Sequence, residues 1–138
     1  MHRFLVFLFA LLLSNEAIAC SCGERGDFES LEKDALYVLE AKITDKSVFR
    51  SFTQNQFALA PIVFYKGSPT STIDVWTRKS TSSCGMDFKL GEDYVIFLFK
   101  NENQLSTGRC SVIQRVGYRD YHSEEFGEYI ANKQINKD

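Results

Sequence analysis

Alternating apolar and polar residues predict several β-strands along this chain. Residues 35–48 place apolar side chains at every second position, which is the period of a strand with one buried face, and residues 56–65 repeat this signal with Phe57 and Leu59 and again with Ile62 and Phe64. Residues 72–77 repeat this alternation over a shorter length, and residues 94–99 are apolar throughout, as expected for a central strand. Pro61 predicts an edge or a bulge in the second segment, because proline has no amide hydrogen to donate to a strand partner.

Helical features are confined to two short segments. Residues 28–33 suit one or two helical turns, and Ser123 is a favourable N-cap for a helix late in the sequence. In that helix Phe126, Tyr129 and Ile130 recur at the i, i+3, i+4 spacing that places apolar side chains on one face. About five strands and a terminal helix predict an all-β fold with minor helix, a small closed Greek-key β-barrel of the OB-fold type.

Residues 1–19 have the features of a secretory signal peptide. Arg3 supplies a positive charge, residues 4–13 form an unbroken apolar run, and Ala-Ile-Ala at 17–19 is a small-residue cleavage pattern. A membrane anchor is the competing interpretation, but an apolar helix of that length spans only about 15 Å, whereas a bilayer core needs about 20 residues. We therefore predict cleavage before Cys20 and an exported protein, either secreted or periplasmic.

The mature sequence, residues 20–138, predicts one domain with a modest core. The net charge is −2, and no run of Lys or Arg points to nucleic acid or to an anionic lipid surface. No further segment is long and apolar enough for a transmembrane helix. The sequence also has no internal repeat and no Pro/Gly/Ser-rich linker, so we expect no second domain.

The four cysteines, Cys20, Cys22, Cys84 and Cys110, predict two disulfides, because an even number in an exported chain is typical of a disulfide framework. Four-cysteine zinc sites usually use C-x₂₋₄-C pairs and a thioredoxin-type site needs C-x-x-C, whereas this chain has one C-x-C and two isolated cysteines. A bond between Cys20 and Cys22 would close a small strained ring. Spacing alone does not choose between Cys20–Cys84 with Cys22–Cys110 and Cys20–Cys110 with Cys22–Cys84.

Several short segments together resemble the tissue inhibitors of metalloproteinases. Cys20-Ser21-Cys22, directly after a predicted cleavage site, is similar to the start of their mature chains. The resemblance continues in the same order and with similar spacing through Ala35 to Ile43, Ser83-Cys84-Gly85, Phe88 to Gly91, Tyr94 to Ile96, and Leu105 to Thr107 followed by Cys110. It covers most of residues 20–115 and identifies the chain as a short, single-domain form of this netrin-like family.

The resemblance implies a netrin-like OB-fold barrel with the disulfides Cys20–Cys84 and Cys22–Cys110. It also implies a mechanism in which the free amine and the carbonyl oxygen of Cys20 chelate the catalytic zinc of a target metalloendopeptidase. Ser21 would then enter the specificity pocket of that protease, so the binding residues would be Cys20, Ser21 and Cys22. The protein itself would need no cofactor and no metal of its own.

One departure of the sequence from this family leaves an alternative function open. The animal inhibitors have a third disulfide in this domain, and Leu31 or Glu32 falls roughly where its early cysteine would be. Netrin-like barrels also serve as plain binding modules, so an exported OB-type protein-binding module without inhibitory activity is the alternative. A cysteine after a signal peptide can also be lipidated, but Ala17 is a poor match to the usual leucine, and a thioether on Cys20 would leave another cysteine unpaired. We expect no lipid anchor.

No arrangement of residues predicts an enzyme. His122 is the only histidine after the predicted cleavage site, and Asp87, Glu92 and Asp93 have the positions of ordinary solvated turn carboxylates. No nucleophile, base and orienting group recur at a known spacing. Four aromatic residues lie at strand periodicity and are interpreted as core rather than as a base-stacking platform; they are Trp76, Tyr94, Phe97 and Phe99.

Overall fold

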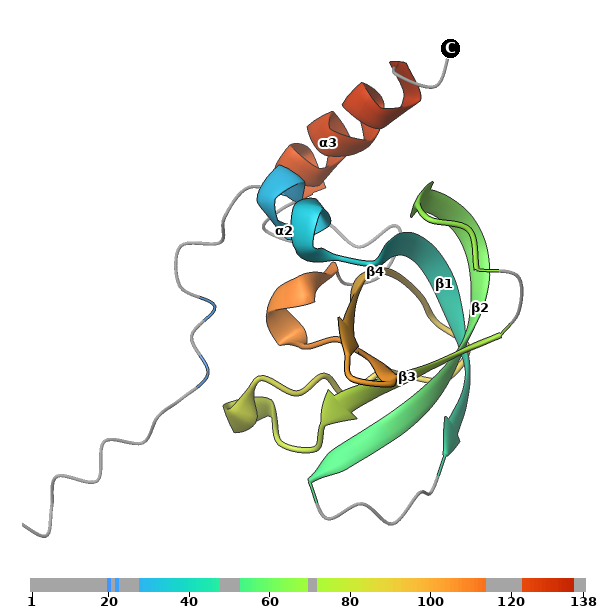
Figure 1. The fold of residues 1–138 in the computed structure, drawn as a ribbon, viewed down its shortest axis with the longest axis vertical. Helices are drawn as coiled ribbons and strands as arrows, with labels where there is room; N and C mark the ends of the chain where they lie inside the picture. The colour runs from blue at the N-terminus through green and yellow to red at the C-terminus, as the bar shows by residue number, and fades with distance from the viewer. Residues whose placement is uncertain are drawn as a thin grey trace, which may run out of the picture.

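The computed structural model describes residues 20, 22, 28–47, 53–69, 72–113 and 123–135. The elements within these ranges are α2 (Phe28–Asp34), β1 (Tyr37–Ser47), β2 (Gln54–Lys66), β3 (Ile73–Arg78), the 3₁₀-helix η1 (Thr81–Ser83), β4 (Asp93–Asn101), β5 (Gln104–Ser106), the 3₁₀-helix η2 (Arg109–Ser111), β6 (Val112–Ile113) and α3 (Ser123–Ile135) (Figure 1). The predicted signal peptide, Ser21 and His122 lie outside the described residues, so the predictions made for them stay predictions.

The strands close into a barrel. β1 pairs antiparallel with both β2 and β4, β2 pairs with β3, and β4 pairs with β5, while β3 and β5 run parallel. The ring therefore runs β1-β2-β3-β5-β4 and back to β1, and the short strand β6 adds to β4. Because β3 lies beside β5 rather than β4, the connections cross as in a Greek-key barrel. The predicted small closed barrel with a C-terminal helix is confirmed.

The inside of the barrel is filled by the apolar positions that alternate along the strands. Leu39, Ala41 and Ile43 of β1 are all at most 1% exposed, and Phe57 and Leu59 of β2 are 0% exposed. The rings of two further core residues, Phe88 and Tyr94, meet edge to face with centroids 5.1 Å apart, and the Phe57 ring meets Phe88 at the same distance. The two-residue period read from the sequence thus corresponds to this inward-facing side.

A second apolar cluster lies outside the barrel, beneath the two helices. Val38 of β1 and Phe97 of β4 are both 0% exposed although their neighbours in the strand point inward. Phe28 of α2 stacks on Phe97 with ring centroids 6.0 Å apart, and Tyr129 of α3 lies 5.8 Å from Phe28. Figure 1 shows α2 and α3 side by side at one end of the barrel. Residues 94–99 of β4 are apolar throughout because this part of the strand is covered on both faces, as predicted for a central strand.

Pro61 lies beside an irregularity in β2. Ala41 is opposite Pro61 while the preceding Glu40 is opposite Val63, so Ile62 is an extra residue in the β2 strand. The pairing of β2 with β3 covers only Gln54 to Leu59, which leaves this second half of β2 bonded to β1 alone within the described residues. Pro61 therefore lies both beside a bulge and in an edge part of the strand, the two alternatives that the sequence predicts.

The aromatic residues expected in the core are only partly there. Tyr94 is 3% exposed and Phe97 is 0% exposed, as expected. Phe99 is half-buried against the outer cluster, and Trp76 is half-buried and belongs to neither apolar cluster. Alternate positions on a strand point to opposite faces, so Trp76, placed between the buried Val75 and Thr77, faces away from the barrel interior.

In the described part of the chain, every helix is too short or too polar to cross a lipid bilayer.

Candidate functional site

The segment at the predicted mature N-terminus is tied to the barrel at two points. Cys20 is bonded to Cys84 and Cys22 to Cys110, with Cα–Cα distances of 5.1 and 5.3 Å. This is the pairing that the resemblance to the tissue inhibitors of metalloproteinases implies. Their partners lie beside the two 3₁₀-helices, since Cys84 directly follows η1 and Cys110 is part of η2. Cys20 and Cys22, which are separated by a single residue, are thus bonded to two cysteines that lie 26 residues apart along the chain.

The backbone segments that contain Cys84 and Cys110 are also hydrogen-bonded to each other. The backbone amide of Arg109 donates a hydrogen bond of 2.9 Å to the carbonyl oxygen of Cys84. A Cβ atom on Gly108 would lie 2.8 Å from that same oxygen, so the two backbone segments are in direct contact. The sulfur atoms of Cys20, Cys84 and Cys110 all lie within 4.8 Å of one another. The two disulfides therefore form a single compact group at this side of the barrel.

The Cys84 segment is held against the end of β3 by its backbone. A Cβ atom on Gly85 would lie 1.9 Å from the carbonyl oxygen of Arg78, so only glycine allows this approach. The carbonyl oxygen of Ser80 accepts hydrogen bonds from the amides of Ser83 and Gly85, at 3.1 and 2.9 Å. The next residue along, Met86, donates its buried amide to Thr77 Oγ1 at 2.9 Å. The support for the N-terminal segment is therefore largely main-chain.

All four cysteine sulfurs are oxidised and only half-buried. Each is in one of the two disulfides, and no cysteine is free. A sulfur in a disulfide is not a thiolate, so this group presents no zinc ligand of the four-cysteine type. The intermediate burial of Cys20 and Cys22 leaves part of their surface facing solvent. The chemistry available at this site is consequently that of main-chain atoms rather than of sulfur.

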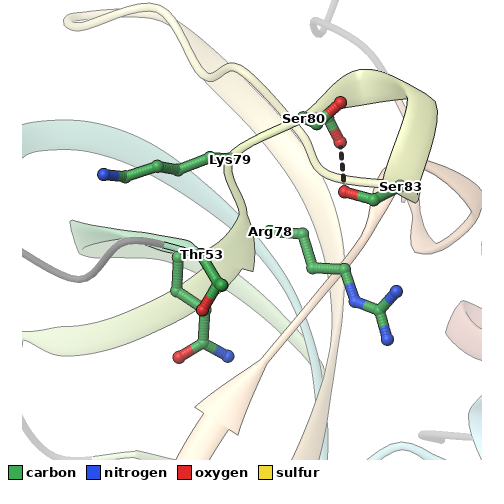
Figure 2. A pocket seen from close by; sticks show the side chains of 6 residues that line it. Thr53, Arg78, Lys79, Ser80 and Ser83 are labelled. Carbon is green, nitrogen blue, oxygen red and sulfur yellow. Dashed lines mark hydrogen bonds between the residues drawn. The ribbon is translucent and has the colours of Figure 1, made fainter.

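A polar hollow of about 500 Å³ lies close to this disulfide group. The described residues that line it come from the start of β2, the end of β3 and the η1 segment; they are Thr53, Gln54, Arg78, Lys79, Ser80 and Ser83. The Lys79 amide donates to the Thr53 carbonyl oxygen at 2.9 Å, which joins the two strand ends. Figure 2 shows the Lys79 and Arg78 side chains extending in different directions, with Thr53 between them.

This hollow was not predicted from the sequence, although a signal for it exists. Residues 78–83 read Arg-Lys-Ser-Thr-Ser-Ser, two cations followed by four hydroxyl side chains, immediately before Cys84. Thr53 and Gln54 are more than twenty residues earlier in the chain, and only the β2–β3 pairing brings them alongside. Arg78 and Lys79 could be recognised in the sequence as a basic pair, whereas the position of Thr53 and Gln54 beside them depends on the strand register.

The turn carboxylates interpreted as solvated have specific partners. Asp87 accepts a hydrogen bond from the Lys46 ammonium at 3.2 Å and remains exposed. Asp93 lies 2.9 Å from the Lys42 ammonium, and Glu92 accepts from the Tyr94 hydroxyl at 3.3 Å. These contacts link β1 to β4 and to the loop before it. They are structural links, and nothing in them marks a catalytic carboxylate.

A second group of ionisable side chains joins the helices to the barrel. The Lys133 ammonium of α3 lies 2.6 Å from the Glu32 carboxylate of α2 and 5.6 Å from the centre of the Tyr129 ring. Burial, followed by a hydrogen bond to Glu32 and nearby carboxylates, raises the pKa of Tyr129. Burial and the Asp93 carboxylate raise the pKa of Glu40, and a hydrogen bond with Tyr65 partly offsets this.

No sequence pattern predicts that ionisable group. Glu32 and Lys133 are 101 residues apart. Their pairing depends on the docking of α3 against α2, which periodicity does not specify. We assign the group to the attachment of the two helices, because it lies at their contact with the barrel rather than beside the disulfides.

A comparison with models of known protein families found no match, and a comparison with curated proteins also found none. The fold and the disulfides define this chain as a small closed all-β barrel with two disulfides, which hold Cys20 and Cys22 to the barrel. The cysteine framework is compatible with export, since structural disulfides persist in oxidising compartments.

Proposed function

We propose that the mature protein is an exported inhibitor of a zinc metalloendopeptidase. After removal of residues 1–19, the free amine and the carbonyl oxygen of Cys20 would bind the catalytic zinc of the target, and Ser21 would enter its specificity pocket. One observation carries the proposal. Cys20 and Cys22 are each bonded to the barrel and both remain partly exposed, so both ends of the Cys20–Cys22 segment are fixed at the surface.

The chemistry of such an inhibitor is consistent with this arrangement. A catalytic zinc keeps one coordination position for water, which an inhibitor can displace. An α-amino group has a pKa of about 8, so at neutral pH a sizeable fraction of the amine is uncharged and its nitrogen lone pair can bind the metal. Because both ends of the segment are fixed in advance, little conformational entropy is lost on binding. The sulfur of Cys20 is then structural, while its main-chain atoms are functional.

The test is an inhibition assay on a panel of zinc endopeptidases, with oxidised protein whose N-terminus at Cys20 is first verified by intact mass and N-terminal sequencing. Adding one alanine before Cys20 would move the amine about 3.8 Å and convert the Cys20 nitrogen into a planar amide, which cannot donate its lone pair. We expect inhibition to be lost while the barrel stays folded.

Two further variants separate the zinc contact from the pocket contact. Ser21→Arg should change the relative affinity for proteases with different pockets. Glu128→Ala, an exposed position on α3, should leave inhibition unchanged. If the verified wild-type protein inhibits no member of the panel, the inhibitor proposal is wrong.

A protein-binding module without inhibitory activity is the second candidate, and exposed apolar residues on β2 favour it. Ile62 is 48% exposed and Val63 is 40% exposed, in the half of the strand that bonds to β1 alone within the described residues. For this function the added alanine would be harmless, whereas Ile62→Ser with Val63→Ser would abolish partner binding. The two candidates thus predict opposite results for the same pair of variants.

A further inference from the structure

The hollow beside η1 has an unusual charge for this molecule. It contains Arg78 and Lys79, both exposed, and none of its described lining residues is acidic, although the chain as a whole has a net charge of −2. Within the described residues no carboxylate forms an ion pair with either cation. Two other cations of the barrel wall, Lys42 and Lys46, are by contrast each paired with an aspartate. Among the residues that the structure describes, the hollow therefore presents two positive charges with no carboxylate partner.

The placement of the two cations selects the shape of the ligand. Figure 2 shows the Arg78 and Lys79 side chains extending in different directions, so the guanidinium and the ammonium do not converge on one point. A single small anion would reach only one of them. An extended chain with at least two negative charges reaches both.

The hollow is also joined mechanically to the Cys20 anchor. Ser83 lies in its lining and is the residue before Cys84, which is bonded to Cys20. The Ser83 hydroxyl donates to the Ser80 carbonyl oxygen at 2.9 Å (Figure 2). The same oxygen accepts the Gly85 amide. A protein docked on the N-terminal segment would therefore bring its own surface over this hollow.

We propose that the hollow binds an acidic peptide segment of the protein that docks at Cys20. That the partner docks at Cys20 rests on the proposed function. Binding of an acidic peptide to the hollow does not depend on that function and can be measured on its own. Arg78 would bind one carboxylate with its planar guanidinium, and Lys79 would bind a second as a point charge. Such contacts add specificity and accelerate association, and they weaken as ionic strength rises.

The experiment is an NMR titration of the ¹⁵N-labelled, oxidised protein with a short acetylated peptide of alternating Glu and Gly. We expect amide shifts confined to residues 53–54 and 78–83, which are reduced by added salt and absent when Gln replaces Glu in the peptide. Arg78→Gln with Lys79→Gln should weaken binding about tenfold, the size expected for two exposed ion pairs. The matched control, Lys89→Gln with Lys100→Gln, makes the same change in net charge at two exposed lysines elsewhere and should leave binding unchanged.

Each other result has a definite meaning. No localised shifts, or equal weakening in both double variants, would overturn the proposal. Tighter binding of a sulfated disaccharide than of the Glu peptide at the same residues would also overturn it, in favour of a glycan ligand. Peptide binding that persists in the alanine-extended protein, while wild-type protein inhibits no protease, would separate the hollow from the inhibitor proposal. In that case the acidic-peptide site stands and the inhibitor proposal fails.

Discussion

At the scale of single residues, close backbone contacts determine where the N-terminal segment is held. The Gly85 position is crowded by backbone atoms of β3 and Ser80, which cannot rotate away as a flexible side chain would. The adjoining Cys84 has a φ of 64°, a left-handed conformation that costs a residue with a Cβ atom about 1 kcal/mol. The disulfide to Cys20 and the hydrogen bond from Arg109 hold Cys84 in this conformation.

Gly85→Ala should accordingly destabilise the protein. The added methyl group would lie 1.9 Å from the Arg78 carbonyl oxygen, so the Cys84 segment must move away from β3. Overpacking of this kind typically costs about 1–3 kcal/mol, to be measured by urea unfolding. The matched control is Gly127→Ala in α3, where nothing lies within 4 Å and the better helix propensity of alanine should stabilise by about 1 kcal/mol. Equal effects of the two substitutions would contradict this view of Gly85.

At the scale of elements, the short helix α2 depends on a residue from β2. A helix of seven residues is too short to be stable alone, and its last carbonyl groups have no partners within the helix. The Lys66 ammonium donates to the carbonyl oxygens of Glu32 and Ala35, each at 2.5 Å, and to that of Lys33 at 3.4 Å. A cation at this end also complements the negative end of the helix dipole.

Lys66→Met should therefore loosen α2 from the barrel. The substitution keeps the apolar stem but removes the donor from the carbonyl groups at the end of α2, a loss of about 1–3 kcal/mol for partly buried groups. Urea unfolding gives the stability, and hydrogen exchange should show faster exchange in α2 and α3 than in β1 or β4. Lys100→Met, at an exposed lysine of β4, should change stability little. Uniformly faster exchange throughout the barrel would argue against a local role for Lys66.

The elements themselves were largely predictable, because each depends on local pattern. Alternation over 35–48 predicted β1, and the apolar run at 94–99 predicted β4. The pattern did not predict that Val38 would be buried, because the outward face of β1 is covered by helices that are distant in the sequence. For the same reason Trp76, expected in the core, lies only half-buried outside it.

At the scale of the whole molecule, the sequence predicted the barrel and the resemblance supplied the disulfide pairing, whereas contacts between distant segments were not predictable. Spacing left two pairings open for Cys20 and Cys22, since loop length discriminates weakly between them. The hollow at Arg78 and Lys79 needed the register of β2 against β3, which turn length and side-chain pattern do not specify here. The part of the site that could not be predicted, the hollow, therefore depends on the register between strands that are distant in the sequence.

Both disulfides should contribute to global stability by similar amounts. They join residues 64 and 88 positions apart, and in the chain-entropy model the two loops differ in their contribution by only about 0.3 kcal/mol. Replacing both Cys22 and Cys110 by Ala should lower the free energy of unfolding by about 2–4 kcal/mol, and replacing both Cys20 and Cys84 should do nearly the same. Paired substitutions avoid a free thiol that could exchange with the remaining disulfide.

Urea unfolding of the two double variants, each with and without a reductant, measures this directly. The reductant should destabilise the wild type more than either variant, because each variant has only one bond left to lose. Inhibition gives a second readout: without the Cys22–Cys110 bond, residue 22 is no longer tethered, and ordering the segment on binding costs entropy. We expect weaker inhibition from a barrel that still folds. A double variant with wild-type stability would show that its disulfide does not hold this segment to the barrel.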